Sequence, residues 1–245
     1  MSIVQRIQEH LANPPSTEDG ESWDTKPSPP FSADEIAAME RKLGHSLPAE
    51  TRALLEYCSG FDGGTLECFD FWGRDETFAY PKSLRERFRC IAVDGAGNFW
   101  FYWKGAGSGD LGPVFYYQHE GPMYFYQCDS LVQFVDEWLR EMTPPYKSLI
   151  NDVYEFRIRP IKELNNDLLT REAAMAGGDE VLRAFAEPLE QDVMIYDFRS
   201  AKPGDGVDLR YLDFIAAHPK WPILAGRGRS TFLRKLKRFF FGRAQ

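Results

Sequence analysis

A dense run of aromatic residues between two turn sequences is the feature that most constrains the fold. Residues 99–126 hold 11 of the 36 aromatic residues of the chain. Residues 90–93 form a compact apolar run, residues 94–98 (Asp-Gly-Ala-Gly-Asn) have the composition of a tight turn, and residues 99–103 follow as an aromatic strand. We therefore predict a β-hairpin here. A second strand pair is predicted directly after it, over residues 113–119 and 123–127.

The side chains of the aromatic strand alternate between the two faces of its sheet. Trp100 and Tyr102 are therefore expected to lie opposite Phe99, Phe101 and Trp103. One face is expected to be core, and the other is either covered by a helix or available to a partner. A stacking platform for nucleic acid is not expected, because three acidic residues and a single lysine are the only charged residues among these strands.

Two helices are predicted before this strand-rich region. Ser32 and Glu35 have the spacing of a capping box, and Gly44 ends the helix that they begin. Pro48 is a good first-turn residue for a second helix, which Gly60 stops.

Hydrophobic periodicity predicts the remaining elements. Helices are expected over residues 2–12, 130–142, 163–176, 178–187, 208–217 and 230–241, and strands over residues 65–72, 154–158 and 193–198. The resulting prediction is an α+β fold, an antiparallel sheet with helices packed on one side, followed by a C-terminal α/β extension.

Composition divides the chain into four segments. Residues 1–30 are predicted to hold a short helix and an acidic, proline-rich linker, and residues 31–145 the α+β domain. Residues 146–219 are predicted to be an extension or a small second domain, and residues 220–245 a basic amphipathic tail.

Charge is distributed unequally along the chain. Residues 220–245 contain eight Lys or Arg and no Asp or Glu, whereas residues 1–219 carry a net charge of −16. An acidic body repels nucleic acid and attracts basic partners, so we expect a basic protein partner and no nucleic acid.

The class of protein is narrowed further by what the sequence lacks. Apolar runs are far shorter than a membrane span, and the first residues do not resemble a signal peptide, so a cytoplasmic location is expected. The four cysteines form no Cys-x-x-Cys pair and are expected to be free thiols, mostly buried.

Several motifs in residues 31–142 share the order and spacing of a known family. They are Phe31-Ser32-x-x-Glu35-Ile36, Glu40-x-x-Leu43-Gly44, Leu47-Pro48, Gly60, Ile91-Ala92-x-Asp94-Gly95-x-Gly97-Asn98, Val114-Phe115 and Leu131-x-x-Phe134. Together they resemble the SUKH superfamily, which includes the yeast cell-wall assembly regulators and many bacterial immunity proteins.

The resemblance implies an α+β domain that binds other proteins and has no known catalytic centre. In bacteria such domains commonly neutralise a toxin delivered by neighbouring cells, often a nuclease. The family has no fixed catalytic residues to transfer, so the resemblance implies no enzyme activity and no cofactor.

Catalytic and metal chemistry is not indicated by the histidines. His10, His45, His119 and His218 are not spaced as metal ligands, so no metal site is expected. His119 beside Glu120 at a turn is expected to be structural. The glycine-rich residues 104–112 lack a following Gly-Lys-Ser/Thr and are predicted to be a hairpin connection.

A group of acidic residues around aromatic side chains is the candidate partner-binding surface. The alternatives are a solvated edge and a surface that fits the cationic cleft of a partner such as a nuclease. The candidate partner-binding residues are Asp62, Glu67, Asp70, Trp72, Asp75 and Glu76, and Arg74 is the one basic residue among them in the sequence.

The basic tail is a third candidate surface. Its predicted helix places Phe232, Leu233, Leu236, Phe239 and Phe240 on one face. It packs against its own acidic body, or it binds a membrane surface or a partner.

The sequence therefore predicts a non-catalytic protein-binding domain, an immunity protein that binds and neutralises a cognate basic toxin. The alternative is a regulatory scaffold of the cell-wall assembly regulator type, contacting proteins or the membrane surface.

Overall fold

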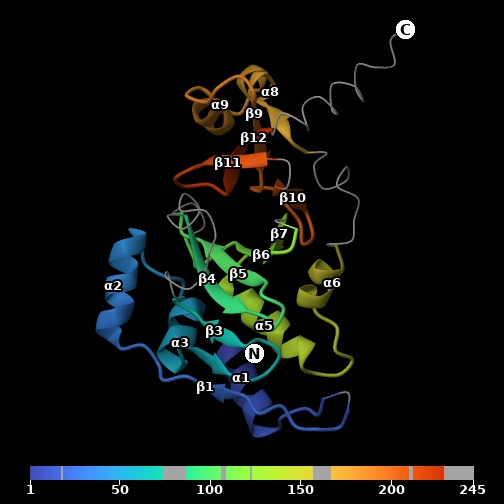
Figure 1. The fold of residues 1–245 in the computed structure, drawn as a ribbon. Helices are drawn as coiled ribbons and strands as arrows, with labels where there is room; N and C mark the ends of the chain where they lie inside the picture. Colours follow the sequence, from blue (N-terminus) through green and yellow to red (C-terminus); the bar gives the residue numbers. More distant parts are fainter. Residues whose placement is uncertain are drawn as a thin grey trace.

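The computed structural model describes residues 1–17, 19–73, 87–105, 109–121, 123–156, 167–209 and 212–228. Figure 1 gives the arrangement of their helices and strands. In chain order the elements are α1 (Ile3–Ala12), β1 (Lys26–Pro27), α2 (Ala33–Leu43), α3 (Ala49–Tyr57), β2 (Gly60–Asp62), β3 (Cys68–Asp70), β4 (Phe88–Val93), β5 (Phe99–Trp103), β6 (Val114–Gln118), β7 (Met123–Cys128), α5 (Leu131–Glu141), α6 (Leu149–Glu155), β8 (Leu169–Thr170), α8 (Arg171–Ala176), α9 (Glu180–Ala186), β9 (Val193–Asp197), β10 (Gly206–Asp208), β11 (Leu212–Ala217) and β12 (Ile223–Gly228).

Eight strands form one antiparallel sheet in the order β1-β2-β3-β4-β5-β6-β7-β10. The strands β1 to β7 follow one another in sequence, as expected of hairpin connections. The eighth strand comes from the C-terminal part of the chain, and Gly206 of β10 pairs with Phe125 of β7. A Cβ atom at Gly206 would lie 2.5 Å from the Tyr124 carbonyl oxygen, so this close approach requires glycine.

The predicted signals at the two ends of α2 are confirmed, whereas those of α3 are shifted, because Pro48 is the residue before the helix and Cys58, not Gly60, follows its end. Ser32 Oγ accepts a hydrogen bond from the Glu35 amide at 3.3 Å, and Glu35 Oε2 accepts one from the Ser32 amide at 2.8 Å. Gly44 has a φ of 79°, the left-handed conformation that ends α2. Ser130 begins α5 by accepting from the Gln133 amide, close to the predicted start.

One face of the large sheet packs against helices. A single apolar core joins buried side chains of α1, α2, α3, α5 and α6 to strand residues that include Trp100, Tyr102 and Tyr116. Trp138 of α5 is fully buried, and its ring centroid lies 4.7 Å from that of Phe61. This face is the predicted α+β arrangement.

The other face packs against a second sheet. The strands β11-β12-β9-β8 form an antiparallel four-stranded sheet in that order. Its Phe198, Tyr196 and Leu224 share a core with Phe101 and Phe115 of the large sheet. The opposite face of the aromatic strand is therefore covered by strands of the C-terminal extension, whereas a helix or a partner was expected there.

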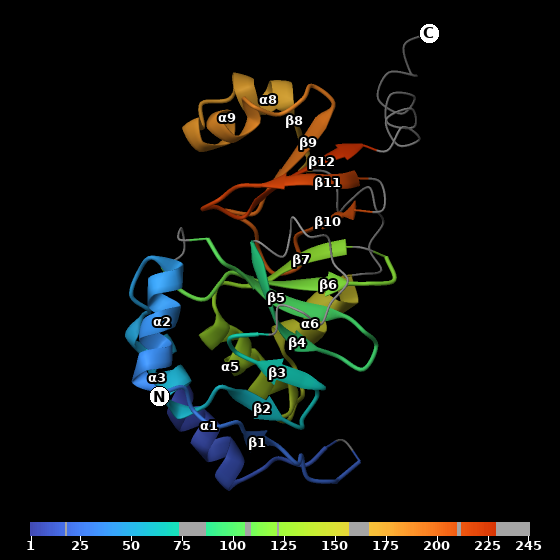
Figure 2. The same cartoon turned by 60° about the vertical axis from the view of Figure 1, so that its left-hand side comes forward.

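The helices α8 and α9 pack on the far side of the second sheet, where Phe185 and Ala174 join a third apolar cluster with Val193 and Ile223. Figure 2 shows the layers in order, with α8 and α9 at one end, the second sheet next, and the large sheet with its helices below.

Two predicted elements are wrong. Residues 208–217 were predicted as a helix and instead contain the last residue of β10 and all of β11. The register of β11 shifts between Phe214 and Ala216, so Phe214 faces one core and Ala216 another. This β-bulge removes the strict alternation by which a strand is recognised.

Of the strand predicted over residues 154–158, Tyr154 and Glu155 instead form the end of α6, and Phe156 is its C-cap. Ser148 Oγ accepts from the Asn151 amide and begins this helix, which buries Ile150 and Val153 three residues apart. The predicted helix 163–176 becomes β8 followed by α8 over its described part, and residues 157–166 and 229–245, which include the predicted helix 230–241, lie outside the described residues.

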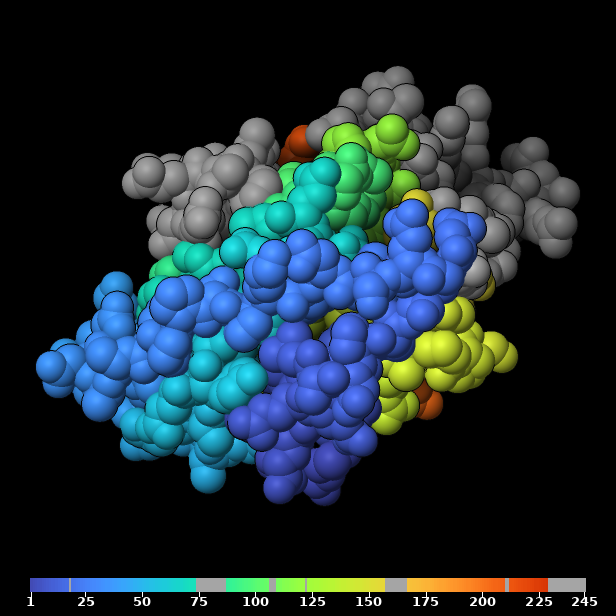
Figure 3. All heavy atoms as spheres, turned by 90° about the horizontal axis from the view of Figure 1, so that it is seen from below, coloured from blue at the N-terminus to red at the C-terminus, as the bar shows by residue number. Residues whose placement is uncertain are grey.

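Residues 13–30, which were predicted as a linker, lie against the body of the protein. Lys26 and Pro27 pair with β2, and Trp23 Nε1 donates to the Met142 carbonyl at 3.2 Å. In Figure 3 this N-terminal segment, in blue, crosses the lower end of the molecule beside α1.

Candidate protein-binding surface

The β2–β3 hairpin carries the first three of the predicted acidic residues. Asp62 is exposed at the end of β2, where its register partner is Lys26 of β1. Lys26 Nζ lies 2.9 Å from a carboxylate oxygen of Asp24. This edge of the sheet therefore places two exposed carboxylates around one exposed lysine.

Glu67 lies beside the turn between β4 and β5. It is exposed, and its amide donates to the Val93 carbonyl at 2.9 Å. A Cβ atom added at Gly95 would lie 3.2 Å from Glu67 Oε1, which places the carboxylate against that turn. Asp94, in the same turn, uses Oδ1 to accept from the Ala96 and Asn98 amides.

Asp94 is thus an acidic neighbour of Glu67 that sequence reasoning treated only as a turn residue. The two are 27 positions apart, and the pairing of β3 with β4 brings them together. Their proximity follows from that strand pairing, which no local sequence pattern specifies.

Asp70 and Trp72 belong to a turn and are half-buried. Asp70 Oδ1 accepts from the amides of Trp72 and Gly73, both at 3.0 Å, so this carboxylate holds the turn after β3. The Arg89 guanidinium lies 4.5 Å from the centroid of the Trp72 ring, and Arg89 Nη1 donates to the Trp72 carbonyl at 3.0 Å.

Arg89 is therefore a residue of this surface that the sequence analysis missed. It stands on β4 and covers Trp72 by a cation–π contact, so Trp72 is held in place by its own chain. Asp75 and Glu76, with Arg74, lie outside the described residues. Of the predicted six, the structure exposes Asp62 and Glu67 and uses Asp70 and Trp72 in a turn.

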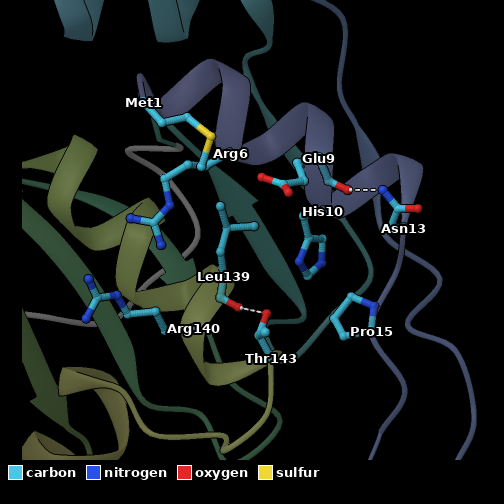
Figure 4. Close-up of a pocket in the computed structure, with 9 residues that line it drawn as sticks. All are labelled: Met1, Arg6, Glu9, His10, Asn13, Pro15, Leu139, Arg140 and Thr143. Atoms are coloured by element: carbon cyan, nitrogen blue, oxygen red, sulfur yellow. Dashed lines mark hydrogen bonds between the residues drawn. The ribbon is translucent and has the colours of Figure 1, made fainter.

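A hollow between α1 and α5 is the second candidate site. Its volume is about 470 Å³, and Figure 4 shows Arg6, His10 and Arg140 among the side chains around it. The Arg6 guanidinium pairs with Asp136, and Arg140 Nε lies 3.3 Å from the other carboxylate oxygen of Asp136. His10 is only 8% exposed, and burial lowers its pKa below the ordinary histidine value.

The cysteines are suited to packing rather than to reaction. All four are free thiols; Cys58, Cys90 and Cys128 are buried, and Cys68 is half-buried. Burial raises the pKa of Cys58 and of Cys90 to about 12. At neutral pH these two thiols stay protonated and are poor nucleophiles.

His119 directly follows β6. His119 is exposed, and its amide donates to Asn98 Oδ1 at 3.3 Å. Within the described ranges, no cluster of three or more His, Cys, Asp or Glu has the arrangement of a metal site. Nor does any helix in those ranges combine the length and hydrophobicity needed to span a membrane.

Part of the basic C-terminal region contacts the acidic body. Arg227 of β12 lies 2.5 Å from a carboxylate oxygen of Glu190 and 3.2 Å from one of Asp192. These ion pairs raise the Arg227 pKa. Arg227, the first Lys or Arg after position 220, is therefore paired within the chain.

The comparisons with known proteins give one match. Residues 30–137 match the model of the SMI1 / KNR4 family (SUKH-1). No curated protein and no solved structure matches the chain. The matched range extends from three residues before α2 into α5, and it includes β2 to β7 but none of the second sheet.

Proposed function

Because this chain belongs to the SUKH superfamily through residues 30–137, we propose that it is an immunity protein that binds and neutralises a cognate basic toxin. Membership of the family by itself supports a binding domain of the immunity or regulator type. The step to toxin neutralisation is our proposal and rests on charge and on the surfaces that remain open.

The observation that carries the proposal is the position of the exposed acids. Both faces of the large sheet are packed within the chain, one against helices and one against the second sheet. A partner of this domain is therefore expected at its ends and turns. Asp62 and Glu67 are exposed there, and Glu67 lies against the turn that holds Asp94, on a body with a net charge of −16 over residues 1–219.

The proposed mechanism is steric and electrostatic. A negative surface attracts a basic protein from a distance, raises the association rate and fixes the orientation of the complex. Blocking the cationic cleft of a toxin needs about 800 Å² of contact on each partner and no reacting group. Four free thiols fit a protein that acts in the reducing cytoplasm, where we place it.

The test is a protection experiment with a candidate toxin, chosen as a large modular protein with a basic C-terminal domain whose gene is adjacent to that of this chain. The C-terminal domain of that toxin is expressed in a sensitive bacterium with and without this protein. We expect growth to be restored and the two proteins to co-purify. Growth arrest that persists with both proteins present, and no complex between them, would contradict the proposal.

A charge-reversal variant locates the surface. D62K/E67K is expected to lose protection or to slow association at least about tenfold at low salt. The matched control is E172K/E187K, which changes net charge equally at two exposed positions in or next to α8 and α9. Equal loss in both variants would show that net charge alone matters and would contradict the placement of the surface.

The regulator alternative predicts a different result. A scaffold that contacts proteins or membranes through its basic tail would bind anionic vesicles, and deletion of residues 229–245 would abolish that binding. It would give no protection against a neighbouring toxin.

A further inference from the structure

The hollow between α1 and α5 has two chemically different ends. In Figure 4, Arg6 and Arg140 lie at one end and His10, Asn13 and Pro15 at the other, with Leu139 between them. The family match begins at residue 30, so α1, which supplies three of the nine residues that line this hollow, lies outside it.

The arginine end is already neutralised. Arg6 pairs with Asp136, and Arg140 Nε lies 3.3 Å from Asp136 and 3.8 Å from Glu137. Two guanidinium groups thus face two carboxylates. An anionic ligand would have to compete with these ion pairs, so this end does not favour an anion.

The histidine end carries several hydrogen-bond acceptors. His10 is 92% buried, and its Nε2 atom has no hydrogen-bond partner among the described residues. Burial lowers the pKa of His10, which keeps the ring neutral at pH 7 and leaves one ring nitrogen able to accept. An unsatisfied buried polar atom is costly, so it indicates a missing partner.

Two more acceptors stand beside His10. Glu9 is exposed, and its carboxylate interacts electrostatically with Arg6, which lies one turn earlier on α1. Asn13 Nδ2 donates to the Glu9 carbonyl at 3.5 Å, which leaves Asn13 Oδ1 as an acceptor. All three residues line the same hollow, and Leu139 and Pro15 supply an apolar wall.

We propose that this end of the hollow binds the ammonium group of a lysine side chain of the protein partner. An ammonium group offers three donors in a compact shape, which suits the acceptors of Glu9, His10 and Asn13. The aliphatic part of the lysine would lie along Leu139 and Pro15. This inference rests on the proposed function, because the lysine belongs to the proposed basic partner. The lysine would be a buried anchor of the complex, the kind of contact that dominates interface energies.

The test is an NMR titration of the full chain with short capped peptides at matched ionic strength. The probes are Ac-Gly-Lys-Gly-amide and Ac-Gly-Glu-Gly-amide, and the readout is the ring resonances of His10. We expect a saturable shift with the lysine peptide, with a Kd on the order of 1–10 mM for so small a ligand, and no saturable shift with the glutamate peptide.

Variants make the test specific. E9Q is expected to weaken lysine-peptide binding at least about threefold, because the only charged acceptor is lost. D34N, which removes an exposed carboxylate on α2, is the matched control and is expected to leave binding unchanged. No saturable shift with the lysine peptide, or equal shifts with both peptides, would overturn the proposal.

The outcome is separable from that of the proposed function. Lysine-peptide binding without protection against the toxin would retain this site and refute toxin neutralisation. Protection that survives in E9Q and H10Q, together with no peptide binding in the wild type, would retain toxin neutralisation and refute this site.

Discussion

The two faces of the large sheet are built from the same strands but from different parts of the chain. Trp100 and Tyr116 point to the helix side. Of the helices and strands that contribute buried side chains to the helix-side core, all except α1 and α6 begin within the range matched by the family model. Phe101 and Phe115, the residues after Trp100 and before Tyr116, point to Tyr196 and Phe198 of the second sheet. One aromatic strand pair therefore serves two cores.

This difference shows what the C-terminal part of the chain does for the domain. Without the second sheet, a large aromatic surface of β4 to β7 would face water, and such a surface promotes association. Supplying the cover within the chain removes that face from the surfaces open to a partner. The proposed partner surface is accordingly at the exposed turns.

The largest effect is expected from truncating the centre of the helix-side core. Trp138 is fully buried, and its ring centroid lies 4.7 Å from that of Phe61 and 5.2 Å from that of Phe69. W138A should lower the free energy of unfolding by about 4 kcal/mol, measured by urea denaturation. I215A, at a side chain that is 38% exposed, is the control and should change it by less than about 1 kcal/mol. A W138A loss as small as that of I215A would refute this core.

The matching change in the second core is F198A. Phe198 is 1% exposed, with its ring centroid 5.0 Å from that of Phe115 and 4.2 Å from that of Tyr196. We expect a loss of about 3 kcal/mol. Hydrogen exchange should accelerate more in β9 and β12 than in α5. Equal acceleration in both regions would mean that the two cores open as one unit, and it would contradict the separation of the helix-side core from the second core.

The sequence predicted the helix-side core better than the second one, and local chemistry explains why. The capping box of Ser32 and Glu35 and the alternation in β5 are visible over a few residues. The cover over Phe101 depends on strands almost 100 positions away, and the β11 bulge hides one of these strands. Long-range pairing of this kind leaves no local signal.

The sequence predicted the acidic residues of the candidate surface but not the contacts between them. Asp62 and Glu67 are exposed as acidic side chains usually are. The covering of Trp72 by Arg89, 17 positions later, and the approach of Glu67 to the turn with Asp94 both follow from strand pairing with β4. That pairing joins residues 17 and 27 positions apart, and it leaves no signal in a short stretch of sequence.

A smaller effect is expected where α9 is tied to the second sheet. Arg199 Nη2 lies 2.6 Å from carboxylate oxygens of both Asp197 and Asp179, and Asp179 also caps α9. R199A should lower the free energy of unfolding by about 1–2 kcal/mol. R199K keeps the charge but loses the planar fork and should recover less than half of that. Wild-type stability in R199A would show that this ion-pair group contributes nothing.

The smallest effect concerns pH on the helix side. Burial raises the pKa of Glu141, whose Oε2 accepts a hydrogen bond from Thr65 Oγ1 at 2.6 Å. Because the folded pKa exceeds the unfolded one, the wild type loses stability as pH rises through the folded pKa. E141Q keeps an acceptor and removes the charge, so it should be more stable than the wild type at about pH 8 and gain nothing at about pH 4. A gain that is the same at both pH values, measured by urea denaturation, would contradict this assignment.

The most direct test of the proposed function is a hydrogen-exchange footprint of this protein in complex with the toxin domain against which it protects in the growth assay. The account predicts slower exchange in the β2–β3 hairpin and in the turn of residues 94–98, with unchanged exchange in β9 and β12. Faster exchange in β9 and β12 on binding would show that the toxin displaces the second sheet to reach the aromatic face, and would contradict it.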